Sequence, residues 1–163
     1  MSLVVMPATD LYLCGAGEPG RRSLAPLERA AALGVRVAVS NNNLRNPFSP
    51  YGNGDLLLAA WTAGLTRRLA DRPAHRMLWE AITSAPAAIL DRPAHGPAVG
   101  ALADLVLLDT EDPLDLVLQS PSVLASLRRG HLVHQQRRIA VRASRAGRQP
   151  ADQRPDHTLE HTS

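Results

Sequence analysis

Apolar and polar positions near the N-terminus follow two different patterns, each typical of a β-strand. Residues 3–6 form a continuous apolar run, which is typical of a strand buried on both faces of a parallel sheet. Valine at every second position of 35–39 predicts another strand, and the apolar side of 27–33, closed by Gly34, predicts a helix before it. A strand, a helix and a strand in this order form a βαβ unit, whose two strands lie parallel in one sheet.

Downstream of this unit, the pattern predicts helices followed by strands. Residues 55–69 are apolar nearly all round, so we expect a buried helix capped by Asn53 or Asp55. Because Pro7 ends the first strand, we expect residues 8–13 to be irregular or briefly extended. The other expected elements are a helix over 74–83, a short helix over 84–90, a strand over 103–109, a short helix ending at Leu118, and a hairpin of 123–127 and 132–134 around the turn 128–130.

The stretch between the second strand and the long helix is rich in polar and turn-forming residues. Residues 39–55 contain the consecutive amides Asn41, Asn42 and Asn43, an Asn-Pro and a Ser-Pro step, the aromatics Phe48 and Tyr51, and a Gly-Asn-Gly turn. An ordinary strand-to-helix connection needs only a few residues. The stretch also follows the carboxyl end of a parallel strand, where α/β folds bind ligands. We therefore take it as the candidate functional loop.

The composition narrows the class of protein. At 163 residues the chain can form one domain with a core or part of a larger one, and with 45% apolar but only 3% aromatic residues the core should be aliphatic. The single Cys14 cannot form an internal disulfide, and the chain has no Cys-x-x-Cys pair for zinc. No apolar run reaches the roughly 20 residues of a membrane helix. The N-terminus also lacks signal-peptide features, so we expect a cytoplasmic protein with no membrane partner.

The positive charge of the chain lies at its C-terminus. All 18 basic residues are Arg, and residues 137–163 carry six of them against three acidic residues, whereas residues 1–136 are neutral overall. A nucleic-acid interface would favour a basic folded face with stacking aromatics, and this segment has no aromatic residue. We therefore expect residues 143–163 to form a disordered, Arg-rich tail, and we rank nucleic acid last among the partners.

Two stretches carry a resemblance to a known family. The segment 3–13, Arg21-Arg22, and the run from Gly34 through N-P-F-S-P-Y-G-N-G-D resemble the C-terminal part of cytosine deaminase-like enzymes of the amidohydrolase superfamily. The sequence G-P-A-V-G-A-L-A-D-L-V-L-L-D-T, which begins at Gly96, resembles the segment that leads into the small β domain of these enzymes. Together the two stretches cover residues 3–138, which is nearly everything except the tail.

This resemblance implies a fold. It predicts an α/β architecture in which a partial (β/α)8 TIM-like barrel, holding only the last two strands and their helices, is followed by strands of a small β domain. A complete barrel takes about 250 residues, so the chain resembles a fragment. We accordingly expect residues 1–95 to be the C-terminal part of an amidohydrolase-like barrel, 96–142 to be a small β-domain segment, and 143–163 to be the tail.

The resemblance also implies a site. In the family, the eighth barrel strand ends in an aspartate that binds the metal and takes a proton from the attacking water, and Asn42 stands at that position here. An amide oxygen can bind a hard cation, but it is not a useful base near pH 7. Phe48, Asn43 and Arg45 are candidate substrate-binding residues. The alternatives are that Phe48 closes the barrel rim, that Arg45 is solvated, and that Asn43, like Asn41, holds the loop through backbone hydrogen bonds.

The metal site implied by the resemblance is incomplete in this sequence. The family uses one divalent metal, zinc or iron, and its histidine ligands would precede Met1, whereas the first histidine here is His75. A mononuclear hydrolytic site needs about three protein ligands. We therefore expect this chain alone to bind no metal, and we expect His75 and His95 to lie at the surface.

Three functions compete on these grounds. The first is a C-terminal amidohydrolase fragment, inactive alone, from an enzyme that hydrolyses non-peptide carbon–nitrogen bonds in cyclic amides or amidines such as a nucleobase-like substrate. The second is a degenerate, non-catalytic module that docks on an N-terminal barrel partner or forms a homo-oligomer, because two strands cannot close a barrel. The third is nucleic-acid binding through the tail. The sequence leaves open whether the chain is itself an enzyme.

Overall fold

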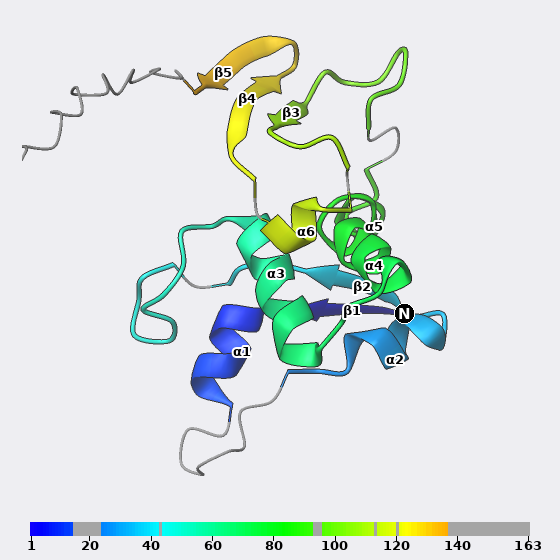
Figure 1. Ribbon diagram of the computed structural model, residues 1–163, viewed down its shortest axis with the longest axis vertical. Helices are drawn as coiled ribbons and strands as arrows, with labels where there is room; N and C mark the ends of the chain where they lie inside the picture. Colours follow the sequence, from blue (N-terminus) through cyan, green and yellow to red (C-terminus); the bar gives the residue numbers. More distant parts are fainter. Residues whose placement is uncertain (15–23, 43, 93–95, 113, 120, 137–163) are drawn as a thin grey trace, which may run out of the picture.

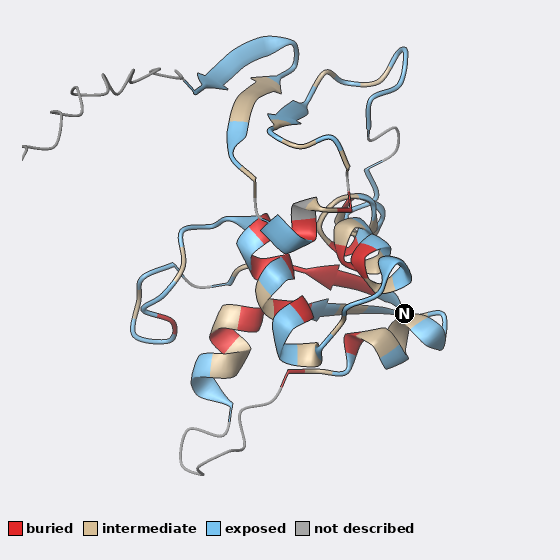
Figure 2. Ribbon diagram, viewed as in Figure 1, coloured by how far each residue is buried: buried red, intermediate tan, exposed pale blue. Residues whose placement is uncertain are grey.

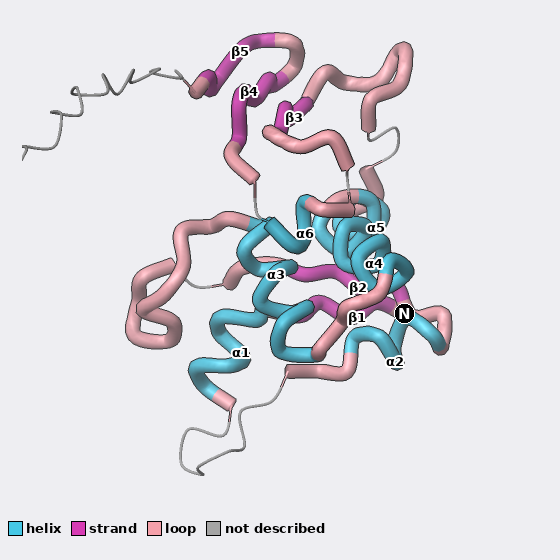
Figure 3. Tube along the Cα trace, viewed as in Figure 1, coloured by secondary structure: helices cyan, strands magenta, loops and turns pink. Residues whose placement is uncertain are grey.

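The described residues fold into a mixed α/β structure with two separate sheets. The computed structural model describes residues 1–14, 24–42, 44–92, 96–112, 114–119 and 121–136. A two-stranded parallel sheet comes first and a three-stranded antiparallel sheet comes last (Figure 1). Figure 3 shows that the helices gather around the parallel sheet, whereas the antiparallel sheet stands apart from them at one end of the molecule.

The parallel sheet confirms the predicted βαβ unit. Strands β1 (Ser2–Val5) and β2 (Arg36–Val39) pair in register along their whole length. Helix α2 (Leu27–Ala32) lies between them in the sequence and contacts both strands. The chain leaves this helix through Gly34, whose φ of 74° is a left-handed conformation that glycine adopts without strain.

Helix α1 (Pro7–Leu13) corrects the expectation that residues 8–13 are irregular or extended. Pro7 ends β1 as expected, but it also opens the helix, because its fixed φ suits the first turn and its missing N–H needs no partner there. The carboxylate of Asp10 accepts a hydrogen bond of 3.1 Å from the N–H of Met6, which satisfies a backbone donor at the start of the helix.

The helices after β2 form where the sequence predicts them. In the described part of the chain they are α3 (Leu56–Arg67), α4 (Arg72–Ile82), α5 (Ser84–Ile89) and α6 (Leu116–Gln119). The side chains of Asp55 and Asp71 accept hydrogen bonds from backbone N–H groups in the first turns of α3 and α4. Such caps satisfy donors that have no partner within the helix, which explains why both helices start directly after an aspartate.

The core lies between the parallel sheet and the helices, and it is aliphatic as the composition predicts (Figure 2). Helices α2, α3, α4 and α5 all contact β2, so β2 is central to the packing. Strand β1 is more peripheral, and its Val4 is 46% exposed. The buried cluster consists of Val5, Leu24, Leu27, Val37, Val39, Ala59, Ala60, Ala63, Leu78, Ala81 and Val117.

Helix α3 is buried on one side only, so the expectation of a fully buried helix is wrong. Its alanines face the core, and Gly64 lets α4 approach closely, because a Cβ at this position would lie 3.0 Å from Cδ1 of Leu78. On the other side, Leu58, Trp61 and Leu65 are 40%, 39% and 64% exposed. None of the helices in the described ranges is long and apolar enough to cross a membrane.

The antiparallel sheet contains β3 (Leu105–Leu108), β4 (Val123–Arg128) and β5 (His131–Gln135), in the order β3-β4-β5. Arg129 and Gly130, with φ values of 50° and 78°, connect β4 to β5. Two consecutive residues with positive φ match the twist of a tight hairpin, so the predicted hairpin is confirmed. Most apolar side chains of β3 and β5 remain exposed.

Candidate functional site

The candidate loop begins where the parallel strands end. The N–H of Ser40 donates to the carbonyl of Val5 over 2.9 Å, which holds the start of the loop beside the end of β1. Further along, the amide nitrogen of Asn41 donates to the carbonyl of Asp55 over 3.4 Å. This bond ties the first residues of the loop to the start of α3. The loop therefore lies at the carboxyl end of the sheet, as the sequence predicts.

A tight turn forms the middle of the loop. The N–H groups of Phe48 and Ser49 both donate to Oδ1 of Asn46, over 3.0 and 3.1 Å. Asparagine stabilises turns in this way because its short side chain can reach backbone donors two and three residues ahead. Ser49 is fully buried, and its hydroxyl donates to the carbonyl of Tyr51 over 3.3 Å. The turn is thus fixed by its own side chains.

The end of the loop is fixed by the cap of α3. Oδ1 of Asp55 accepts hydrogen bonds of 2.8 and 3.3 Å from the N–H groups of Leu57 and Leu58. Oδ1 of Asn53 in turn accepts one of 3.0 Å from the N–H of Asp55. Both side chains therefore serve the backbone at this end of the loop.

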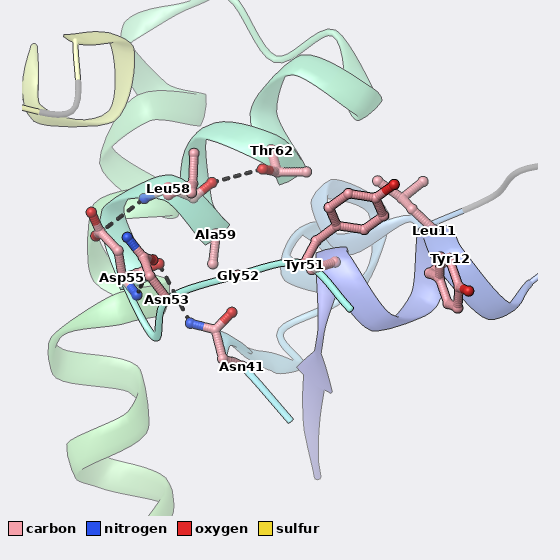
Figure 4. A pocket seen from close by; sticks show the side chains of 11 residues that line it. Leu11, Tyr12, Asn41, Tyr51, Gly52, Asn53, Asp55, Leu58, Ala59 and Thr62 are labelled. Carbon is pink, nitrogen blue, oxygen red and sulfur yellow. Dashed lines mark hydrogen bonds between the residues drawn. The ribbon is translucent and has the colours of Figure 1, made fainter. Parts of the chain in front are cut away.

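A cavity of about 270 Å³ opens between α1, the loop and the first half of α3 (Figure 4). Leu11 and Leu58 give it apolar walls. Tyr12 and Tyr51 stand at one end, with ring centroids 6.2 Å apart and planes at 69°, an edge-to-face arrangement that aromatic pairs favour. Thr62 also lines the cavity, and its hydroxyl donates to the carbonyl of Leu58 within the helix. The cavity is thus largely apolar, with an aromatic pair at one end.

The predicted site residues that the structure describes lie on the loop but do not line this cavity. Asn42 directly follows the tied residue Asn41 and is exposed. Arg45 is exposed and has a φ of 53°, and Phe48 is 61% exposed on the tight turn. Asn43 lies outside the described residues. Within the described ranges, the structure therefore places the predicted residues on one loop without gathering their side chains around the cavity.

The aromatic pair is the part of the site that sequence reasoning missed. Tyr12 lies on α1, a helix that the sequence did not predict, so its position beside the loop was not foreseen. A signal was present in the composition, because the chain contains only two tyrosines. Scarce aromatics in an aliphatic protein are candidates for a pocket wall.

His75 corrects another expectation. It is 6% exposed rather than at the surface, and it lies on the buried stripe of α4 with Leu78 and Ala81. Its position three and six residues before these core side chains was the available signal. His95, which we also expect at the surface, lies outside the described residues.

The residues that the structure describes at this end of the sheet do not fit a divalent metal. Within the described ranges, no three His, Cys, Asp or Glu side chains gather closely enough to hold one. Asp10 bonds to the N–H of Met6, and Asp55 caps α3, so both nearby carboxylates serve the backbone. Metal-dependent hydrolysis generally requires about three protein ligands with an open position. The described residues of this loop do not form such a ligand set.

Curated relatives of the chain are hydrolases, although no family model matches the sequence. The chain is 34% identical over 138 residues to a pterin deaminase from Rhizobium rhizogenes, a match that covers 82% of this chain and 31% of the relative. It is 26% identical over 109 residues to the N-isopropylammelide isopropyl amidohydrolase of a Pseudomonas species, covering 66% of this chain and 27% of that enzyme. The chain thus spans about a third of the length of the curated relatives it matches.

Solved structures agree with these sequence matches. The 5-methylcytosine deaminase from Klebsiella pneumoniae superposes with a TM-score of 0.79 at 23% identity, covering 87% of this chain and 35% of that enzyme. The N-isopropylammelide isopropylaminohydrolase from Burkholderia multivorans superposes with a TM-score of 0.64 at 26% identity, covering 71% of this chain and 30% of that enzyme. Together with the sequence matches, these similarities show that the chain belongs to the amidohydrolase superfamily.

Proposed function

We propose that the chain is the C-terminal part of a deaminase-like amidohydrolase that hydrolyses a carbon–nitrogen bond in a nucleobase-like ring, a cyclic amide or an amidine, and that it is inactive alone. The observation that carries the proposal is the loop after β2. It lies where parallel α/β folds bind ligands, yet the carboxylates of Asp55 on the loop and of Asp10 on α1 bond to the backbone. By the family resemblance, Asn42 would occupy the position of the family's acid.

Two features support the placement at the C-terminal part of the fold. The β1–α2–β2 unit supplies what would be the last two strands of a (β/α)8 barrel, over residues 1–95. The β3–β5 sheet would then belong to the small β domain, over 96–142, and residues 143–163 would be the tail. A sheet with exposed apolar side chains suits a segment that packs against further strands.

The proposed inactivity follows from the chemistry of the loop. Hydrolysis of an amide-like bond requires a base that takes a proton from the attacking water, and the neutral amide of Asn42 cannot serve as one near pH 7. Losing a general base costs about 10²- to 10⁴-fold in rate. The complete enzyme would bind one divalent metal, zinc or iron, and would lie in the cytoplasm.

The test combines a metal analysis with an activity assay. The purified chain is incubated with zinc or ferrous iron, desalted and analysed for metal, and ammonia release is then measured with cytosine, 5-methylcytosine and pterin. We expect much less than one metal per chain and no release above the blank. Pterin deaminase from Rhizobium rhizogenes serves as the positive control for the pterin assay. Stoichiometric metal together with turnover would contradict the proposed inactivity.

A second candidate function is a non-catalytic interaction module. The exposed apolar side chains of α3 and β3, together with Val4 of β1, favour it, because exposed apolar patches commonly mark protein interfaces. This function predicts association with an amidohydrolase barrel or with further copies of the chain. Sedimentation of the purified chain as a compact monomer that binds no barrel partner would argue against it.

A further inference from the structure

The imidazole of His75 is buried in α4, and its Nε2 atom has no hydrogen-bond partner among the described residues. A buried polar atom without a partner costs about 1 to 3 kcal/mol. Nearly all buried polar groups in folded proteins are paired with protein or ordered water, so each exception asks for an explanation. An occupant that reaches this nitrogen would remove the cost.

His75 lines a groove of about 350 Å³ between α3, α4 and α6. Much of the lining is apolar, with Trp61 and Leu65 from α3 and Leu118 from α6, and these side chains are 39%, 64% and 50% exposed. Arg68 adds a cation at the C-terminal end of α3. The groove thus combines exposed apolar walls with a buried nitrogen that can form one further hydrogen bond.

The groove continues into the exposed side of α3. Leu58, Trp61 and Leu65 follow each other at spacings of three and four residues, which places them on one face of the helix. The stripe runs about 10 Å along the helix axis, at 1.5 Å per residue. Leu58 lines the other cavity rather than this groove. A small molecule in the groove would leave that end of the stripe uncovered, whereas a polypeptide could cover the whole stripe.

We infer that the groove and the α3 stripe seat a second polypeptide, and that a backbone group of this polypeptide bonds to Nε2 of His75. The inference rests on the proposed function, because the occupant is the part of an amidohydrolase chain that the relatives carry outside their match to this protein. The match leaves 69% of the pterin deaminase uncovered, since it spans 31% of that enzyme. Backbone donors and acceptors occur along every segment of such a chain, so one can meet the imidazole.

The test mixes the purified full chain with the part of Rhizobium rhizogenes pterin deaminase that lies outside this match, and measures binding by analytical ultracentrifugation. We expect a one-to-one complex. Leu65→Glu places a charge on the apolar stripe and should weaken the complex at least about tenfold. Leu90→Glu is the matched control, because Leu90 is 69% exposed but lies outside the groove, and it should leave the affinity unchanged.

A second variant tests the imidazole itself. His75→Leu removes the unpaired nitrogen, so we expect a thermal midpoint of the isolated chain that is unchanged or higher, and a complex about fivefold weaker. A histidine that only packs in the core would lower the midpoint and leave the affinity as it is. Circular dichroism of each variant verifies that it is folded.

Several outcomes would overturn the inference. They are the absence of a complex, equal effects of Leu65→Glu and Leu90→Glu, an unchanged affinity for His75→Leu, or self-association of the chain that Leu65→Glu abolishes, which would assign the groove to a second copy. The readout is binding rather than turnover. Metal binding with turnover by the isolated chain would therefore contradict the proposed inactivity and leave this inference intact.

Discussion

At the scale of residues, amide side chains shape the backbone of the candidate loop. Asn41 donates to a carbonyl at the start of α3, Asn46 accepts from two N–H groups of its own turn, and Asn53 accepts from the N–H of Asp55. Asparagine suits this task because its side chain resembles a peptide group on a short stem. The interpretation of Asn41 as a residue that holds the loop is thereby confirmed.

Asn42 offers a direct test of the site placement. In the isolated chain, we expect Asn42→Asp to create neither metal binding nor ammonia release, because a single carboxylate does not supply the roughly three ligands required. In a hybrid in which this chain replaces the matched stretch of the pterin deaminase, the same change should strengthen zinc binding, because it adds an anionic ligand. The measurement is zinc affinity by competition with a chelator.

Asn46→Asp is the control for this experiment. It makes the same change of charge on the same loop, and it keeps the acceptor oxygen that the turn requires. Equal zinc affinities for the Asn42→Asp and Asn46→Asp hybrids would refute the assignment of position 42.

A second residue-scale prediction concerns the ion pair of Glu28 and Arg67, which joins α2 to α3. Hydrogen bonds from the Arg67 guanidinium hold the pKa of the Glu28 carboxyl below its ordinary value. A lowered pKa contributes stability that is present at neutral pH and lost as the pH falls through that pKa. We expect Glu28→Gln to cost about 0.5 to 1 kcal/mol at pH 7, since both side chains are partly exposed.

Urea denaturation between pH 7 and pH 3 measures this effect. The difference between wild type and Glu28→Gln should shrink toward the acidic end of the range. Glu80→Gln, on the exposed side of α4, is the control and should show little difference at any pH. A Glu28 difference that persists at pH 3 would show that the effect is not electrostatic.

At the scale of elements, local signals in the sequence predict most of the structure. The βαβ unit, the caps at Asp55 and Asp71 and the hairpin around Gly130 depend on neighbouring residues, and these patterns are visible in the sequence. Helix α1 was not predicted, because Pro7 both ends β1 and begins the helix. The pocket depends on how α1, the loop and α3 meet, which no local pattern contains. The burial of His75 was missed although its helical spacing to Leu78 and Ala81 was visible in the sequence.

Helix α3 shows a different kind of error. Its residues are apolar nearly all round, which is the pattern of a helix covered on every side, yet the structure exposes one stripe of it. The apolar residues of a helix reflect every surface against which the helix packs in its functional state, including surfaces of a bound partner. The disagreement is what the proposed second polypeptide would explain.

The crossing of α3 and α4 gives a prediction for Gly64. A Cβ at this position would lie 3.0 Å from Cδ1 of the fully buried Leu78. Overpacking costs about 1 to 3 kcal/mol, whereas replacing a helical glycine by alanine gains about 0.5 to 1 kcal/mol. We therefore expect Gly64→Ala to lower the free energy of unfolding by about 1 kcal/mol, as measured by urea denaturation.

The control for Gly64→Ala repeats the change in a Leu78→Ala background. There the obstructing atom is absent, so the helical gain alone should remain and the substitution should stabilise the protein. A destabilising effect of the same size in both backgrounds would exclude the contact with Leu78 as its cause.

At the scale of the whole molecule, charge is distributed unevenly along the chain. The net charge of +3 is that of residues 137–163, and residues 1–136 are neutral overall. We expect deletion of residues 137–163 to lower the salt concentration at which the protein elutes from heparin, because fewer cations remain to displace counterions. An unchanged elution would place the anion-binding surface on residues 1–136 and would contradict the third functional hypothesis.

The parallel pairing of β1 with β2 also delays the formation of this sheet during synthesis. Residue 2 pairs with residue 36, so the first strand leaves the ribosome well before its partner has been made. Translation adds about 5 to 20 residues per second, so the edge of β1 stays open for seconds. An unpaired strand edge is a template on which another chain can pair. The β4–β5 hairpin has no such delay, because its strands meet across a tight turn, and it closes almost as soon as it emerges.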